Sequence, residues 1–283
     1  MLEFPKLGFS QIFGEARIFG EYLRFSGDST VSEDRDRNSR ANWRPVLLIP
    51  GLMAADASLY PLGARLRSQG HLVFYAGIWM NANCPAKTLE RLRKRIHEVS
   101  LPTGRKVAIV GHSLGGIYAR ELARMEPNLV EQVFLLGSPV KHALCDTTPY
   151  LRPLVAAMRF MHGRCMEDMS LPCKTCGLDL PQSAPDVRET CIYTKTDGIV
   201  EWHSCVDEGP KVECVEVDSS HCGIPLNPRT WQEISARLAS PAPEAHPLRA
   251  LATVERPHVV AQRTPHRARR LHLKLAARKR NAA

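Results

Sequence analysis

The stretch Lys106-Val-Ala-Ile-Val-Gly-His-Ser-Leu-Gly-Gly116 decides the fold, because an apolar run ends there in a Gly-x-Ser-x-Gly motif and continues directly into helix-forming residues. This order predicts a buried strand, a sharp turn at Ser113 and then a helix with an apolar face. Gly111 and Gly115 leave room for a turn that exposes the serine hydroxyl at the end of the strand. Ser113 is therefore the candidate nucleophile, and the alternative is a serine that only caps the helix.

Two further polar residues follow strand-like runs, in the chain order serine, acid, histidine that is typical of a serine on such a strand–turn–helix. Asp197 stands in an Asp-Gly turn after the run 190–194, and His221 stands in a loop after the alternating run 212–218. His221 is the candidate base for the serine proton, and Asp197 is the candidate acid that orients the imidazole. The alternatives are an ordinary turn and a loop histidine without a role.

Other ionisable residues lie close to these candidates in the sequence, namely Asp207, Glu201, His203, Asp218 and His112. Asp218 precedes His221 by three residues, which is too close to reach the far side of the ring. His112 directly precedes Ser113, so its side chain is expected to point away from the attacked substrate and to pack within the turn.

An acyl-transfer site also needs backbone N–H donors for the oxyanion. The first expected donor is Leu114, and the second comes from the loop after the apolar run 46–50. Pro50 has no N–H and Gly51 lets the chain turn, so Leu52 is expected ahead of Met53. The alternative is a simple Pro-Gly turn after a strand.

Together these four pieces resemble the α/β-hydrolase superfamily, and within it compact bacterial-type lipases and esterases, over residues 44–239. The Ser113 motif and Asp197-Gly198 agree with the family pattern, whereas Pro50 stands where the family usually has histidine. The resemblance implies an ester hydrolase that forms an acyl-enzyme on Ser113 and needs no cofactor. Acyl transfer or thioester cleavage through the same triad is one alternative, and a non-catalytic hydrolase fold that binds a partner is the other.

Six strand-like runs alternate with helical patterns, which predicts an α/β fold with a mostly parallel, doubly wound sheet. The runs are 46–50, 71–76, 106–110, 132–136, 190–194 and 212–218. The helical patterns have apolar faces at Leu59, Leu62 and Leu66, at Leu89, Leu92, Ile96 and Val99, and at Trp231, Ile234 and Leu238. The long interval before the fifth run predicts an insertion at about 141–189, where the resembling family places a cap. Its apolar face is either a mobile lid or a core-packing helix.

The remaining residues are predicted to be appendages of one hydrolase domain at 44–239. Residues 1–25 carry an aromatic helical face that either docks on this domain or contacts a membrane surface. Residues 26–43 are polar and expected to be a disordered linker. Neither a signal peptide nor a long apolar span is recognised, so a cytoplasmic protein, at most peripheral to a membrane, is expected.

Most of the net charge of +9 comes from the C-terminal tail, residues 240–283. The tail is expected to be a disordered basic extension with weak attraction for phosphate or anionic lipid. It contains no Phe, Tyr or Trp, which argues against specific nucleic-acid recognition.

The nine cysteines and the absence of a recognised export signal predict a reducing compartment and mostly free thiols. The spacing of His162, Cys165, Cys173 and Cys176 makes a zinc site in the insertion a hypothesis. A disulfide near the triad loops is a second hypothesis, although the pairing cannot be read from the sequence. Its candidate members are Cys191, Cys205, Cys214 and Cys222.

Overall fold

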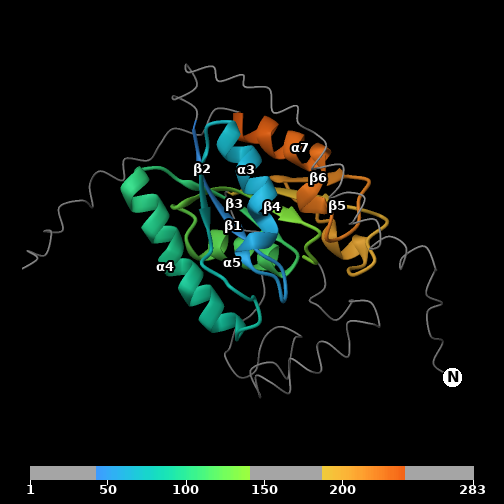
Figure 1. The fold of residues 1–283 in the computed structure, drawn as a ribbon, viewed down its shortest axis with the longest axis horizontal. Coiled ribbons are helices and arrows are strands. Elements are labelled where there is room, and N and C mark those ends of the chain that lie inside the picture. Colours follow the sequence, from blue (N-terminus) through green and yellow to red (C-terminus); the bar gives the residue numbers. More distant parts are fainter. Residues whose placement is uncertain (1–42, 141–186, 240–283) are drawn as a thin grey trace, which may run out of the picture. The chain divides into compact units, whose positions relative to one another are not determined.

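The computed structural model describes residues 43–140 and 187–239, which form a six-stranded sheet with helices on both faces (Figure 1). The strands are β1 (Pro45–Ile49), β2 (Leu72–Tyr75), β3 (Val107–His112), β4 (Val130–Leu136), β5 (Arg188–Tyr193) and β6 (Val212–Glu216). Their order in the sheet is β2-β1-β3-β4-β5-β6, and every neighbouring pair is parallel. The expected parallel α/β sheet is confirmed, and all six predicted runs are strands.

Helices α3 (Tyr60–Ser68) and α7 (Pro228–Ala239) cover one face of the sheet, and α4 (Pro85–Thr103) and α5 (Leu114–Met125) cover the other (Figure 1). Three short 3-10 helices complete the described elements: η2 (Asp56–Leu59), η5 (Trp202–Cys205) and η6 (Ile224–Leu226). Because all strands are parallel, their carboxyl ends lie at one edge of the sheet, where the candidate residues are expected to meet.

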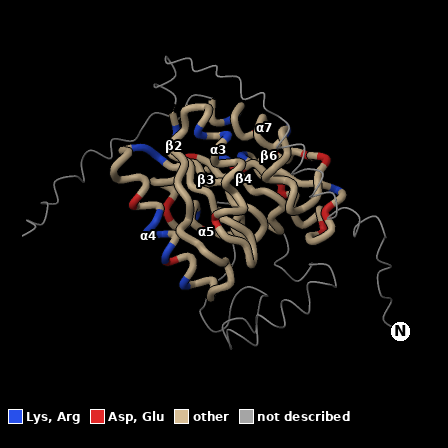
Figure 2. Tube along the Cα trace, in the orientation of Figure 1, with Lys and Arg blue, Asp and Glu red and all other residues tan. Residues whose placement is uncertain are grey.

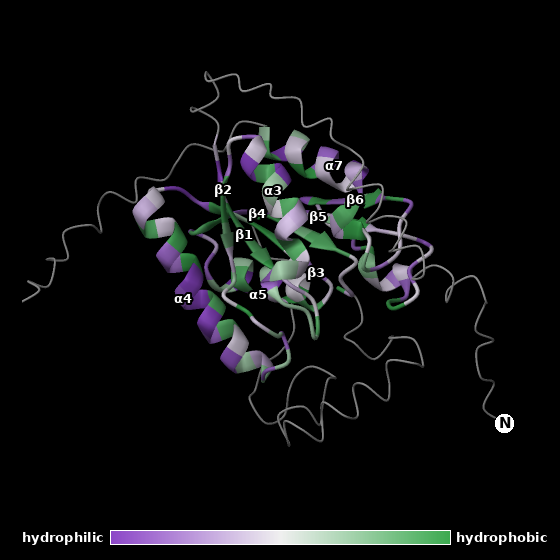
Figure 3. Cartoon of the chain, in the orientation of Figure 1, coloured by the Kyte–Doolittle hydropathy of each residue, from purple (hydrophilic) through white to green (hydrophobic). Residues whose placement is uncertain are grey.

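The α3/α7 face carries the hydrophobic core, and the strands are the most hydrophobic part of the fold (Figure 3). The predicted inward faces of α3 and α7 are confirmed, since Leu62, Leu66, Ile234 and Leu238 are fully buried. The strands contribute alternate residues to this core, as their twofold side-chain period requires. These strand residues are Val46, Leu48, Ala108, Val110, Phe134, Leu136 and Ile192.

Helix α4 shows how local sequence sets both ends of an element. Pro85 occupies its first turn, where a missing N–H costs nothing, and Gly104 ends it in the left-handed conformation with φ 62°. The predicted apolar face is buried, while the outer face carries acidic and basic residues (Figure 2). Ion pairs such as Lys94–Glu90, at 2.9 Å, follow this exposed face.

Several predictions made from the sequence lie outside the described residues. They concern residues 1–25, the linker 26–43 up to residue 42, the cap insertion up to residue 186, the tail 240–283, and the zinc candidates His162, Cys165, Cys173 and Cys176. Within the described ranges, none of the helices has the length and apolar character needed to cross a bilayer.

Candidate active site

Ser113 occupies a strained turn between β3 and α5. Its backbone has φ 53° and ψ −120°, a conformation that costs an L-residue about 1 to 3 kcal/mol. Flanking glycines make the turn feasible, because a Cβ on Gly115 would lie only 2.2 Å from the carbonyl oxygen of Ile49. The Ser113 N–H donates to the carbonyl of Leu136, at 2.8 Å, which anchors the turn to the end of β4.

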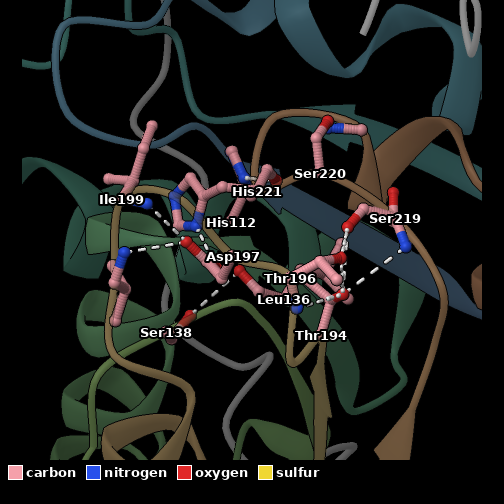
Figure 4. A network of polar contacts seen from close by, with 12 residues as sticks. His112, Leu136, Ser138, Thr194, Thr196, Asp197, Ile199, Ser219, Ser220 and His221 are labelled. Atoms are coloured by element: carbon pink, nitrogen blue, oxygen red, sulfur yellow. Dashed lines mark hydrogen bonds and ion pairs between the residues drawn. The ribbon is translucent and has the colours of Figure 1, made fainter. Parts of the chain in front are cut away.

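Asp197 and His221 form a buried hydrogen-bonded pair (Figure 4). His221 Nδ1 lies 2.6 Å from Asp197 Oδ2. Because a carboxylate only accepts, Nδ1 carries the proton and Nε2 carries the lone pair that a general base needs. The other carboxylate oxygen accepts from the N–H groups of Ile199 and Val200, each at 2.8 Å. The carboxylate is thereby held in one orientation toward the imidazole.

Two threonines tie the loop that carries Asp197 to the loop that carries His221 (Figure 4). The hydroxyls of Thr194 and Thr196 donate to the carbonyl of Ser219, at 2.9 and 2.8 Å. Sequence reasoning missed this clasp, although a Thr-x-Thr pattern directly before Asp197 was its available signal.

The end of β4 brings the two halves of the site together. Leu136 accepts the hydrogen bond from Ser113, and the next residue, Gly137, has φ 57°. A Cβ on Gly137 would lie 3.1 Å from His221 Nδ1, so the histidine ring packs directly over this glycine. The structure therefore brings Ser113 and the Asp197–His221 pair to the same end of β4, at the carboxyl edge of the sheet, and their catalytic roles stay predictions.

His112 contacts the candidate base directly. Its Nε2 donates to the backbone carbonyl of His221, at 3.1 Å, and the two ring centroids are 5.0 Å apart. Burial, together with the neighbouring His221, lowers the pKa of His112 to about 3, so this ring is neutral and holds its proton on Nε2. Sequence reasoning gave His112 a packing role alone, because a bond spanning 109 positions has no local signal.

The loop after β1 lies against the serine turn. A Cβ on Gly51 would be 3.1 Å from Ser113 Cβ. Met53 has φ 58° and donates its N–H to the carbonyl of Asn81, at 2.9 Å, so this N–H is already committed. That observation favours Leu52 over Met53 as the second oxyanion donor beside Leu114, and both assignments stay predictions.

Asn81 holds this loop through three hydrogen bonds and was not identified from the sequence. Besides accepting from Met53, it donates its backbone N–H to Ala54, at 2.9 Å, and its side-chain amide to Pro50, at 2.8 Å. The Asn81 side chain is buried. Its position fixes the loop that faces Ser113.

Comparison with known proteins agrees with this geometry. A family model described as "Alpha/beta hydrolase" matches residues 78–147, which include the Ser113 turn. A triacylglycerol lipase of Pseudarthrobacter phenanthrenivorans is 32% identical over 104 residues, covering 34% of this chain and 33% of the lipase. The crystal structure of Aspergillus fumigatus lipase B has a TM-score of 0.52 at 16% identity, covering 74% of this chain and 55% of that chain. The chain has the α/β-hydrolase fold.

A second similar protein is an esterase. The pimeloyl-[acyl-carrier protein] methyl ester esterase of Klebsiella pneumoniae is 32% identical over 87 residues, covering 31% of this chain and 33% of the esterase. The matches span about a third of the length of the curated relatives.

The competing ionisable residues of the hydrolase have other partners. Asp207 forms an ion pair with Arg120, which also pairs with Glu189 at 3.1 Å. The ring of His203 stacks on Trp202 with 3.6 Å between centroids. The Asp218 carbonyl accepts from the side chain of Asn227, at 2.9 Å. These contacts leave Asp197 as the acid that reaches His221.

The cysteines near the site are free thiols. In this structure Cys191, Cys205, Cys214 and Cys222 are all unbridged, so the disulfide near the triad loops is absent from the state described. Burial and the Asp197 charge raise the pKa of Cys205. Within 43–140 and 187–239, no group of three or more metal-ligating side chains is close enough to hold a metal ion.

Proposed function

We propose that this α/β hydrolase cleaves carboxylic esters through a covalent acyl-enzyme on Ser113. The observation that carries the proposal is the buried Asp197–His221 hydrogen bond of 2.6 Å beside the strained serine turn. Burying a carboxylate and an imidazole together is costly unless their geometry is fixed, and at this edge of the sheet a fixed pair supports acid–base chemistry. The lipase and esterase names of the partial relatives support the same reaction class.

The proposed cycle uses one base twice. His221 Nε2 accepts the Ser113 hydroxyl proton as the serine oxygen attacks the ester carbonyl. The alcohol leaves with that proton, which gives the acyl-enzyme. His221 then deprotonates a water that attacks the acyl group, and the acid and the free serine are released. Asp197 stabilises the imidazolium in both halves, and the N–H groups of Leu52 and Leu114 stabilise each oxyanion.

The surroundings of the oxyanion loop support an ester with an apolar acyl part. Trp79 is 86% exposed, and Met80 and Met53 are 41% and 36% exposed. These side chains belong to the two loops that Asn81 joins. Exposed apolar residues gathered beside a reactive edge favour contact with an apolar substrate. We therefore expect preference for longer acyl chains over acetate.

The test combines covalent labelling with turnover. A fluorophosphonate bonds only to a serine activated by a base, so we expect one adduct per chain, mapped to Ser113. In Ser113→Ala the adduct should vanish and kcat for p-nitrophenyl esters should fall by at least about 10³-fold, with the circular dichroism spectrum unchanged. Ser100→Ala removes another buried serine hydroxyl, on α4, and should leave both readouts intact.

Two outcomes would count against the proposal. Ester turnover that persists in Ser113→Ala would place the nucleophile elsewhere. A folded wild-type protein that takes up no fluorophosphonate would favour the non-catalytic, partner-binding alternative. A series of p-nitrophenyl esters from acetate to palmitate then tests the acyl-chain preference separately from the reaction itself.

A further inference from the structure

Two thiols lie opposite each other on neighbouring strands, away from the proposed triad. The register of β5 and β6 pairs Cys191 with Cys214, so both side chains leave the same face of the sheet. Neighbouring strands are about 4.8 Å apart, within the range of roughly 4.4 to 6.8 Å between Cα atoms that disulfides span. Both thiols are unbridged in this structure.

The two thiols differ in solvent access and in acidity. Cys191 is 1% exposed on the side of the sheet covered by α5, whereas Cys214 is exposed on the edge strand β6. The neighbouring Cys214, together with burial, raises the pKa of Cys191. The neighbouring Cys191 lowers the pKa of Cys214. Cys214 is thus the more acidic thiol and the one that solvent reaches, and Cys191 lies behind it.

The residues around the pair hold both sulfurs in place. Cys191 Sγ donates to Glu189 Oε1, at 3.7 Å, and Glu189 is in turn paired with the buried Arg120. Cys214 Sγ donates to the backbone carbonyl oxygen of Asp207, at 3.3 Å, and the Asp207 side chain pairs with Arg120. One buried guanidinium therefore organises the acidic residues on both sides of the thiols. The proposed ester hydrolysis uses none of these groups.

We propose that Cys191 and Cys214 form a reversible disulfide when a hydroperoxide oxidises Cys214. The Cys214 thiolate attacks the peroxide, the O–O bond breaks, and a sulfenic acid and hydroxide form. The Cys191 sulfur then attacks the Cys214 sulfur, the S–S bond forms, and the sulfenic oxygen leaves as water. In total two thiols and one hydrogen peroxide give one disulfide and two waters, and a dithiol reductant reverses the change.

The location of this bond gives it a consequence for the site. Strand β5 leads into the Asp197 turn, and β6 leads into the His221 loop. A Cys191–Cys214 bond would join the two strands covalently just before the Thr194 and Thr196 clasp. The modification can be detected by mass alone, so its test stands apart from the proposed ester hydrolysis.

The experiment treats the full chain with hydrogen peroxide, blocks the remaining thiols by alkylation and maps the peptides. Trypsin leaves Cys214 and Cys222 in one peptide, 212–229, so a second cleavage after glutamate is needed. It yields peptides 190–195 and 214–216, each with a single cysteine. We expect these two peptides to be linked after oxidation and to separate after dithiothreitol.

Matched variants separate the two steps. In Cys191→Ser the second step is blocked, so dimedone should trap a sulfenic acid on Cys214. In Cys214→Ser both the link and the trapped adduct should disappear, whereas Cys205→Ser, at another buried thiol, should form the link as the wild type does. The proposal is overturned if Cys214 remains fully alkylatable after peroxide treatment, or if it links to a cysteine other than Cys191.

Discussion

The two sides of the sheet are built on different principles. The α3/α7 side has a continuous apolar core that joins residues of both helices to the strands. The α5 side buries Arg120 and Glu189, at 1% and 3% exposure, beside the Cys191 thiol. Apolar packing is non-directional and tolerates small shifts, whereas buried charges need particular partners. The α5 side is therefore where single substitutions and chemical modification should have the most specific effects.

Arg120 gives the largest expected effect, because it alone pairs with both Glu189 and Asp207 among the contacts described above. In Arg120→Met both carboxylates lose this partner, and the free energy of unfolding should fall by about 3 to 5 kcal/mol. Urea denaturation monitored by tryptophan fluorescence measures the change.

Arg124→Met is the matched control on the same helix. Arg124 pairs with Glu121, but its side chain is 48% exposed, so the loss should be under about 1 kcal/mol. If Arg120→Met and Arg124→Met lost the same free energy of unfolding, burial would not determine how much a charged side chain on α5 contributes to stability.

The next prediction concerns His112, which lies where the apolar side of the sheet meets the candidate site. Its pKa is about 3 in the folded protein and about 6.5 when unfolded, so unfolding takes up one proton between these values. This contribution to stability is complete above pH 6.5 and is lost as the pH falls. Relative to His112→Gln, the wild type should lose about 2 kcal/mol more between pH 7 and pH 5.

The measurement is the free energy of unfolding of both proteins at pH 7, 6 and 5, with His97→Gln as the matched control at an exposed position. Parallel pH profiles for the wild type and His112→Gln would mean that His112 becomes protonated without unfolding. Burial lowers the pKa of His71 to about 4 as well, so part of the pH dependence should survive in the variant.

Substitutions of Ser113, at the start of α5, give the smallest expected effect on stability. Glycine adopts φ 53° without strain, whereas alanine keeps the Cβ and the strain. Ser113→Gly should therefore be more stable than Ser113→Ala, with a free energy of unfolding about 1 kcal/mol higher. This figure allows for the extra flexibility of glycine in the unfolded chain. Thermal denaturation of both variants tests this, and a less stable Ser113→Gly would contradict a strained turn.

The sequence predicted the six strands and the meeting point of Ser113, Asp197 and His221 because each follows from a local pattern at a strand end. What it did not predict depends on register and on pairing between distant elements. The hydrogen bond of His112, the three bonds of Asn81 and the pairing of Cys191 with Cys214 arise only when the strands are aligned. Arg120 was missed for a related reason, since its partners Glu189 and Asp207 lie far from it in the sequence.

The pairing of β4 with β5 affects when the candidate site can form during folding. Residues 43–140 carry Ser113, residues 187–239 carry Asp197 and His221, and the sheet joins them from Gln132 opposite Arg188 to Leu136 opposite Ile192. Pairing of segments so distant in the chain forms slowly, because a long loop must close first. In a newly synthesised chain the proposed nucleophile therefore precedes its proposed base, and the two meet only after β5 has paired with β4.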